Sequence, residues 1–283
     1  MGIKLGDLDL QFVSGGQMRL DGGTMFGVVP KVLWQRKCQP DARNRILLDT
    51  NCLLVRGQKR NVLIDTGYGT KGSRRHRNNY ALEDGRRLLT NLSKWGVDPG
   101  DIDVVILTHL HFDHAGGCTV RDKSGRLRPT FPRARYLIQR SEWEDACADL
   151  PELEGAYMKQ DCVPLEEAGV LDLIDGRTEV LPGMTCCLTG GHSRGHQILY
   201  LTMGMQRVVY LGDLCPTSAH LPVLWTMAYD QYPLDVKRLK AQVLSEAADN
   251  HWPVLFDHDP VIQAAILGRD AEQQFVVRDV VSV

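Results

Sequence analysis

The sequence predicts a mixed α/β fold built from two layered halves, on three observations. Short β-branched or alternating runs, typical of hairpins, come first, and a helical segment separates them from an apolar strand. A similar series of strands with a helix recurs in the C-terminal half. This order favours two layered halves over a doubly wound parallel sheet.

The chain has 283 residues, which is long for one domain, but α/β folds of this size often form a single unit. No low-complexity segment, short-period repeat or Pro/Ser-rich linker divides it. We therefore expect one domain over residues 1–283.

The predicted strands are short runs rich in β-branched or alternating apolar residues, and several end in Gly, Asp or His. They cover residues 46–55, 61–65, 103–107, 135–138, 184–188, 197–202, 207–211, 254–256 and 275–283.

Two segments have the apolar spacing of helices. Apolar residues recur near helical spacing over residues 82–95, and Gly96 supplies a stop. The second helix is predicted over residues 233–250, where a proline suits the first turn. Residues 121–132 and the basic stretch 74–77 are predicted to be polar loops.

The charge balance argues against nucleic acid and anionic membranes as partners. A formal net charge of -2, from 33 basic and 35 acidic residues, gives no positive field for nucleic acid or an anionic membrane. No apolar run follows a basic start, and no apolar stretch is long enough to span a bilayer. The eight cysteines never have C-x-x-C spacing, so we expect reduced thiols in a cytoplasmic protein.

The stretch LTHLHFDHAGG, residues 107–117, carries three histidines and an aspartate within six positions where a predicted strand ends. His109 and His111 are two apart in an extended or turning backbone, so both imidazoles can reach one ion. Asp113 and His114 then face a neighbouring position. We expect the following two glycines to permit the turn through their free backbone angles.

These four side chains are too many for one open catalytic site and too few for two. Further ligands are therefore expected at other strand ends. The chain offers three, each following an apolar run: His192 in LTGGHSRGHQ, Asp213 in YLGDLCP and His258 in LFDHDP.

Taken in order, these motifs resemble the metallo-β-lactamase superfamily, whose signature H-x-H-x-D-H stands here at residues 109–114. The resemblance runs from LIDTGYG at residues 63–69 through Gly191-His192 and Gly212-Asp213 to His258. It implies an αββα four-layer sandwich, with two mixed sheets flanked by helices and the metals at one end between the sheets.

The resemblance also implies two metal sites. It places Asp65 behind them, where its carboxylate steadies a ligand through a hydrogen bond. The implied ligands are His109, His111 and His192 for the first site, Asp113, His114 and His258 for the second, and Asp213 as the bridge.

Such a pair would supply chemistry at neutral pH. A metal lowers the pKa of bound water from 15.7 to about 7, so that a bridging hydroxide is available, while the second ion polarises the bond under attack. Asp113 is the expected catalytic group that passes a proton to the leaving oxygen. We expect two Zn²⁺ ions, with iron, manganese or cobalt as alternatives.

Substrate contacts are expected from two apolar segments. Met25 and Phe26 lie between glycines in residues 22–29, which cap the pocket or, alternatively, pair with a second subunit in a homodimer. The segment after Asp213 adds four candidates whose alternative is core packing. These are Cys215, His220, Trp225 and Tyr229.

The bridging aspartate is generally lacking in the β-lactamases that use Asp and His at the second site, so the pattern is most similar to the lactonase and organophosphate hydrolase branch. We expect an enzyme that opens a small-molecule carboxylic ester or lactone. The alternatives are a phosphotriester or phosphodiester hydrolase with the same metals and, in another class, a non-catalytic metal-binding protein.

Overall fold

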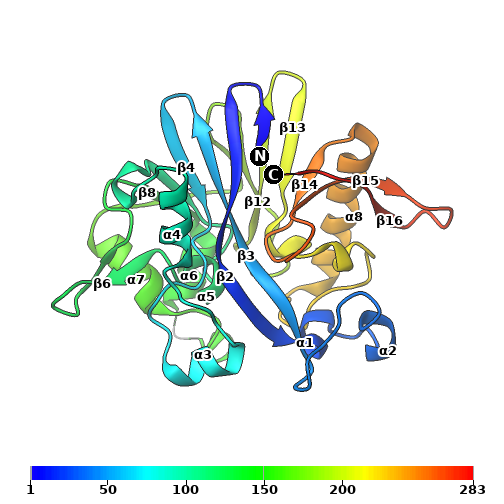
Figure 1. Cartoon of the computed structure of the whole chain (residues 1–283), viewed down its shortest axis with the longest axis horizontal. Coiled ribbons are helices and arrows are strands. Elements are labelled where there is room, and N and C mark those ends of the chain that lie inside the picture. Colours follow the sequence, from blue (N-terminus) through cyan, green and yellow to red (C-terminus); the bar gives the residue numbers. More distant parts are fainter. Residues whose placement is uncertain (1, 149, 283) are drawn as a thin grey trace.

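The computed structural model describes residues 2–148 and 150–282. Two mixed seven-stranded sheets stand at its centre, with helices on their outer sides (Figure 1). This arrangement confirms the predicted α/β class. The first sheet contains, in spatial order, β1 (Ile3–Leu5), β2 (Leu8–Asp21), β3 (Arg45–Gly57), β4 (Arg60–Ile64), β5 (Val104–Ile106), β8 (Arg135–Gln139) and β9 (Leu171–Ile174). The second contains β10 (Arg177–Leu181), β11 (Met184–Leu188), β12 (Gln197–Met203), β13 (Gln206–Tyr210), β14 (Pro253–Leu255), β15 (Ala264–Arg269) and β16 (Phe275–Val280).

Three apolar clusters join the four layers. Side chains of both sheets meet in a central cluster, where Ile64 and Ile106 face Leu199 and Tyr210. A second cluster packs helices on the first sheet, and a third packs one long helix on the second sheet. Each fully buried Leu or Ile side chain stabilises the fold by about 1.5–3 kcal/mol. The helices are α4 (Arg87–Lys94), α6 (Arg140–Cys147) and α7 (Lys159–Glu167) on the first sheet and α8 (Pro233–Asn250) on the second.

Parallel pairing brings several strand ends to one edge of the structure. β4 pairs in parallel with β5, and β13 pairs in parallel with β14. The carboxyl ends of parallel neighbours lie at the same edge of a sheet. The residues that follow these four strands therefore converge, and they include Asp65, His109, Asp213 and His258.

Several strands lie outside the predictions, namely β1, β2, β9, β10 and β15. The longest is β2, in which Gly15 and Gly16 interrupt the apolar pattern. The structure accommodates both glycines in a bulge between Ser14 and Gln17, where a Cβ atom on Gly16 would lie 2.1 Å from the hydroxyl of Tyr68. The predicted strand over residues 275–283 ends at Val280, and residue 283 lies outside the described residues.

One predicted loop is wrong, and the other is right only in part. Residues 74–77 open α3 (Arg74–Tyr80), which begins where Ser73 Oγ accepts a hydrogen bond from the His76 amide. Residues 121–132 contain most of a small hairpin of β6 (Thr119–Arg121) and β7 (Leu127–Pro129).

The helix predicted over 82–95 begins only at Arg87. The other short helices are α1 (Gly22–Phe26), α2 (Lys31–Trp34) and α5 (Phe112–Ala115), and the 3-10 turns are Pro99–Asp101, Pro151–Leu153, Gly212–Leu214 and Ser218–His220.

Lys240 on α8 is a buried cation that fixes the loop following Asp213. Its ammonium group donates hydrogen bonds to the carbonyl oxygens of His220, Pro222 and Trp225 at 3.0, 3.2 and 2.6 Å. Burial lowers the pKa of this side chain. The three carbonyls depend on one donor group, so the loop and the helix are coupled.

We expect Lys240→Met to lower the free energy of unfolding by about 3 kcal/mol, because buried carbonyls lose a charged donor. Arg238→Met is the matched control on the same helix, since its side chain is 72% exposed, and it should change stability by less than about 0.5 kcal/mol. Urea denaturation followed by circular dichroism measures both. Equal stability of the two variants would contradict this role of Lys240.

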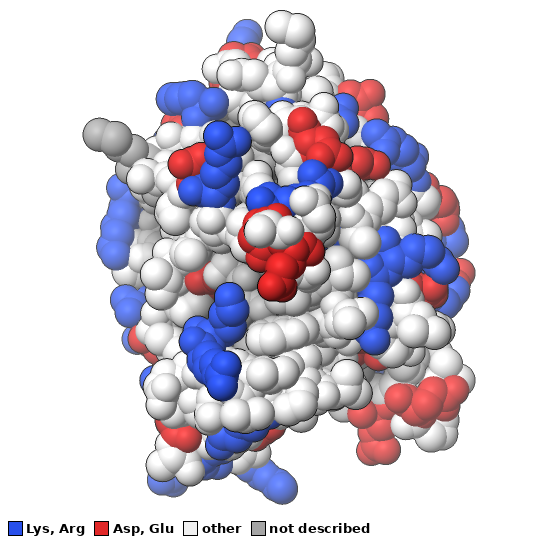
Figure 2. Space-filling model, turned by 90° about the vertical axis from the view of Figure 1, so that its right-hand side faces the viewer, with Lys and Arg blue, Asp and Glu red and all other residues white. Residues whose placement is uncertain are grey.

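The surface carries both signs of charge. On the face drawn in Figure 2, acidic and basic side chains are interspersed among broad uncharged areas. Among the described residues, no helix combines the length and hydrophobicity needed to cross a bilayer.

Candidate metal centre

The signature motif lies in a turn between β5 and the short helix α5. His109 and His111 occupy the turn, and Asp113 and His114 follow on α5. Gly117 is needed for a different reason from the predicted one. Its backbone angle is not in the left-handed region, but a Cβ atom there would lie 2.1 Å from the Thr66 carbonyl oxygen. Close packing of backbone on backbone therefore requires the glycine.

The first group of donors combines three histidines and Asp213. The ring nitrogens His109 Nε2 and His192 Nε2 each lie 3.0 Å from His111 Nδ1. His192 Nε2 is also 3.0 Å from Asp213 Oδ2. Nitrogens that bind one tetrahedral zinc ion at about 2.0–2.1 Å lie roughly 3.3 Å apart. The spacing of these donors therefore suits one small cation.

The second group shares Asp213 and lies beside the first. His114 Nε2 is 3.0 Å from His258 Nε2, which is 3.3 Å from Asp213 Oδ1. Asp113 Oδ2 lies 3.6 Å from His258 Nε2. The four donors that all lie within 4.8 Å of one another include an unpredicted carboxylate, Asp257, together with His114, Asp213 and His258.

Hydrogen bonds on the far side of the imidazoles fix their orientation. His114 Nδ1 lies 3.0 Å from Asp65 Oδ2, His192 Nδ1 lies 2.9 Å from Asp230 Oδ1, and His258 Nδ1 lies 2.8 Å from the Asp49 carbonyl oxygen. These acceptors require the proton on Nδ1, so each Nε2 presents a lone pair to the cluster.

This proton arrangement tests whether metals fit the site. The facing Nε2 atoms of His114 and His258 would both present lone pairs at 3.0 Å, which repel unless a cation or a proton lies between them. Imidazoles and carboxylates are the ligands that divalent transition metals accept. The donor set therefore fits a pair of divalent cations.

Burial and neighbouring charges act differently on the two groups. Burial, with the adjacent imidazoles, holds the pKa of His109 and His111 well below the ordinary value, so both are neutral. Burial also disfavours the charged form of His114, but Asp65 and Asp113 outweigh it and raise the pKa of His114 to about 9. A cation must therefore displace a proton from the second group at neutral pH.

Asp65 holds its position with a left-handed backbone, φ 57°, which is unfavourable for a residue with a side chain. Its Oδ1 accepts a hydrogen bond of 2.8 Å from the Thr108 amide, and its Oδ2 faces His114. The unfavourable backbone conformation therefore occurs at the residue that was predicted to orient a ligand through a hydrogen bond.

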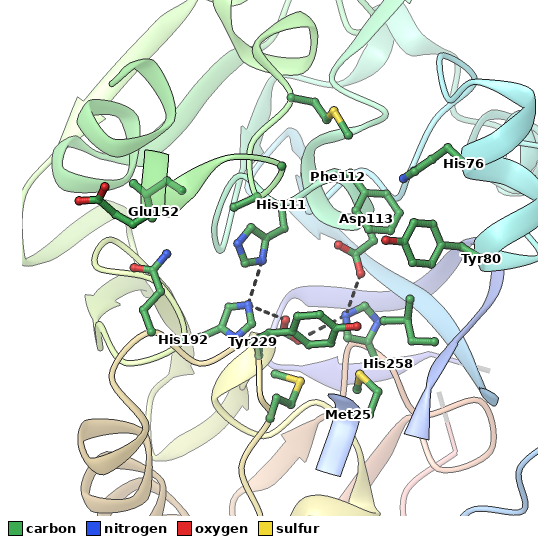
Figure 3. Close-up of a pocket in the computed structure, with 18 residues that line it drawn as sticks. Met25, His76, Tyr80, His111, Phe112, Asp113, Glu152, His192, Tyr229 and His258 are labelled. Atoms are coloured by element: carbon green, nitrogen blue, oxygen red, sulfur yellow. Dashed lines mark hydrogen bonds and ion pairs between the residues drawn. The ribbon is translucent and has the colours of Figure 1, made fainter. Parts of the chain in front are cut away.

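An open pocket leads to the donors. Figure 3 shows His111, Asp113, His192 and His258 turned toward a common centre, with Tyr229 in front of them and His76 and Tyr80 to one side. The pocket is mostly apolar around this polar floor. Its apolar lining includes Leu20, Met25, Phe112, Leu153, Met158 and Met227.

Of the six side chains predicted to face substrate, the structure places Met25 and Tyr229 in the pocket lining. The other four lie in the packing behind it. Phe26 stacks on His220 at 4.6 Å, with Trp225 edge-on at 5.7 Å. His220 Nε2 is 2.8 Å from the Met25 carbonyl oxygen, and Cys215 is fully buried against α8.

His76, Tyr80 and Phe112 line the pocket without having been predicted. His76 and Tyr80 stand four apart on α3, so they share one face of that helix. The sequence signal for helix α3 was Ser73, because a serine just before a helix commonly caps its first turn.

Two buried acids that orient the donors also escaped the sequence analysis. Asp230 binds His192, as described above. Glu142 accepts hydrogen bonds from the Leu110 amide at 2.9 Å and from Ser193 Oγ at 2.6 Å, and so ties together the two loops that carry His111 and His192. His196 is buried near the first group, with Nδ1 held by Thr189 Oγ1 at 2.6 Å.

A family model described as the metallo-beta-lactamase superfamily matches residues 45–258, well over half of the chain. The chain belongs to the metallo-beta-lactamase superfamily. As a member of this superfamily, it is similar over nearly its whole length to a probable metal-dependent hydrolase from Staphylococcus aureus. The two are 32% identical with a TM-score of 0.89, covering 99% of this chain and 100% of the other.

Two further superfamily members are lactonases by name. AidC, a dizinc quorum-quenching lactonase solved with N-hexnoyl-L-homoserine, matches with a TM-score of 0.83 over 100% of this chain and 98% of its own. At 20% identity this likeness shows the fold alone. An N-acyl homoserine lactonase from Bacillus thuringiensis is 30% identical over 164 residues, 53% of this chain and 57% of the relative. The chain thus spans less than two thirds of that relative's length.

Proposed function

We propose that this superfamily member is a dinuclear metal-dependent hydrolase that opens a lactone or a carboxylic ester. The observation that carries the proposal is the convergence of two donor groups on one shared carboxylate, Asp213, at the floor of an open pocket. A non-catalytic metal-binding protein needs neither an open floor nor a shared ligand.

The proposed ligands follow the two groups. His109, His111 and His192 would hold the first metal, Asp113, His114 and His258 would hold the second, and Asp213 would be shared by the two groups. Zinc is the proposed metal, and the same imidazole and carboxylate donors accept iron, manganese or cobalt. When bound, the pair supplies a nucleophilic hydroxide near neutral pH and polarises the carbonyl under attack.

The protein's own side chains complete the reaction. Three of the ligands proposed for the second metal also line the pocket, namely Asp113, Asp213 and His258. We assign to the Asp113 carboxylate the transfer of the proton of the attacking hydroxide to the leaving alkoxide oxygen. Asp65 and Asp230 keep the imidazoles of His114 and His192 in the orientation that the site needs.

The pocket wall favours a neutral substrate with an apolar substituent. Three methionines, Met25, Met158 and Met227, line it with Phe112. Thioether and aromatic side chains adapt to flexible alkyl groups and exclude water from them. An N-acyl lactone combines a carbonyl for the metal floor with an acyl chain for this wall, and the lactonase name of the 30% identical relative supports the same class.

Purified, zinc-loaded protein should hydrolyse N-acyl homoserine lactones. We expect the kcat/KM for these substrates to be at least about tenfold higher than the kcat/KM for simple γ-lactones that lack the acyl chain. The reason is that each buried methylene group of the acyl chain contributes about 0.8 kcal/mol, and two or more should be buried. Aryl esters, thioesters and phosphotriesters complete the panel. Activity confined to phosphorus esters would replace the lactone proposal by the organophosphate alternative. Two bound metals with no hydrolysis of any ester would favour a non-catalytic protein.

We place this reaction in the cytoplasm. All eight cysteines are free, and five of them are buried. A reducing compartment suits a fold that forms none of the disulfides that eight thiols would permit.

A further inference from the structure

Asp257 is a buried carboxylate that none of the functions assigned above uses. It follows β14 and immediately precedes His258, and its carbonyl oxygen accepts a hydrogen bond of 2.7 Å from the Asn51 amide. The residue is 1% exposed. Neither Oδ1 nor Oδ2 has a hydrogen-bond partner among the described residues. A buried carboxylate without partners is costly unless a cation compensates its charge.

The Asp257 carboxylate points into the second donor group. One of its oxygens lies within 4.8 Å of donor atoms of His114, Asp213 and His258, and Oδ2 lies 3.8 Å from His258 Nε2. It lines a small space together with Asp65, Asp113 and Tyr210, and it is not among the described residues that line the larger pocket. Asp113 lines both this space and the open pocket.

The second group contains more carboxylates than imidazoles. Its two imidazoles, His114 and His258, face three carboxylates, those of Asp113, Asp213 and Asp257. The first group has three imidazoles and shares only Asp213. A carboxylate-rich site prefers harder cations than a nitrogen-rich one. The two halves of the centre therefore differ in chemistry.

We propose that Asp257 is an additional ligand of the second metal, which makes that site richer in oxygen than the first and better suited to manganese, iron or cobalt. This inference rests on the proposed dinuclear function and assigns a side chain that is not in the implied ligand set.

The test compares Asp257→Asn with the matched control Asp259→Asn. Asp259 is two positions away on the same loop and is also buried, but its carboxylate is fully used. It accepts hydrogen bonds from the Ser218 amide and hydroxyl and from the amides of Val261 and Ile262. Loss of this structural carboxylate should weaken the loop without changing the preference between metals.

Metal content is measured by mass spectrometry after equilibration of each protein with buffered Zn²⁺ or Mn²⁺. We expect Asp257→Asn to bind the second equivalent of either metal at least about tenfold more weakly, since even outer partners of ligands contribute 10–100-fold. The loss should be larger for Mn²⁺ than for Zn²⁺, and the increase in Tm on adding Mn²⁺ should shrink. Asp259→Asn should retain the wild-type ratio of the two affinities.

Unchanged affinity for the second equivalent in a folded Asp257→Asn protein would overturn the proposal while leaving the dinuclear function intact. A wild-type chain that binds fewer than two metals would overturn both. If the variant does not fold, crystals of the metal-loaded wild-type protein decide. An Asp257 oxygen within about 2.6 Å of the second metal is the expected result, and a longer separation would reject it.

Discussion

Replacing Asp213 by alanine is expected to lower kcat/KM for lactone hydrolysis by at least about a thousandfold. When several residues act as one catalytic unit, removing one of them lowers activity about as much as removing them all. Among the described residues, Asp213 is the single side chain that belongs to both donor groups. Its loss should also reduce the metal content from two ions per chain toward one. Steady-state kinetics and elemental analysis of the same preparation measure both effects.

The matched control for this experiment is Asp279→Ala, since that side chain is 70% exposed and far from the donors in sequence. It should retain full activity and both metals. An Asp213→Ala protein that keeps two metals and more than about a tenth of the activity would contradict the shared role of this carboxylate.

Replacing Asp113 by asparagine should lower kcat by about 10²–10⁴-fold, the usual contribution of a positioned acid or base. Asparagine keeps a carbonyl oxygen that can still bind the second metal, so both sites should stay filled when the assay contains excess metal. The amide cannot accept and return a proton, which is the role assigned to Asp113. The loss should therefore fall on kcat, with KM nearly unchanged.

The leaving group separates this role from a structural one. A lactone releases a basic alkoxide that needs a proton, whereas an aryl ester releases a phenoxide that leaves without one. We expect the Asp113→Asn variant to lose at least about tenfold more activity on the lactone than on the aryl ester. Equal losses on both substrates, or loss of a metal, would show that Asp113 acts only by ligation.

The convergent donors could be predicted from the sequence because each stands beside a strand end or in a dense motif. Parallel pairing of β4 with β5 and of β13 with β14 then brings those ends together. The two-layered order of strands and helices was visible for the same reason, since alternating apolar patterns mark strands locally. The resemblance of residues 109–114 to a known signature supplied the division into two sites.

The pocket wall could not be predicted, because an apolar side chain has the same local pattern in a wall and in a core. Phe26 and Met25 are neighbours in the chain, yet the first packs against His220 and the second faces the pocket. Asp230 and Asp257 have no spacing that distinguishes them from surface acids. Their roles depend on contacts across the fold, and only the folded positions of His192 and His258 reveal them.

Anomalous diffraction from zinc-loaded crystals, recorded on both sides of the zinc absorption edge, tests the central claim most directly. The account predicts two peaks about 3.5–4 Å apart, with Asp213 between them, His109, His111 and His192 around one, and His114 and His258 around the other. A single peak, or peaks that Asp213 does not touch, would contradict it.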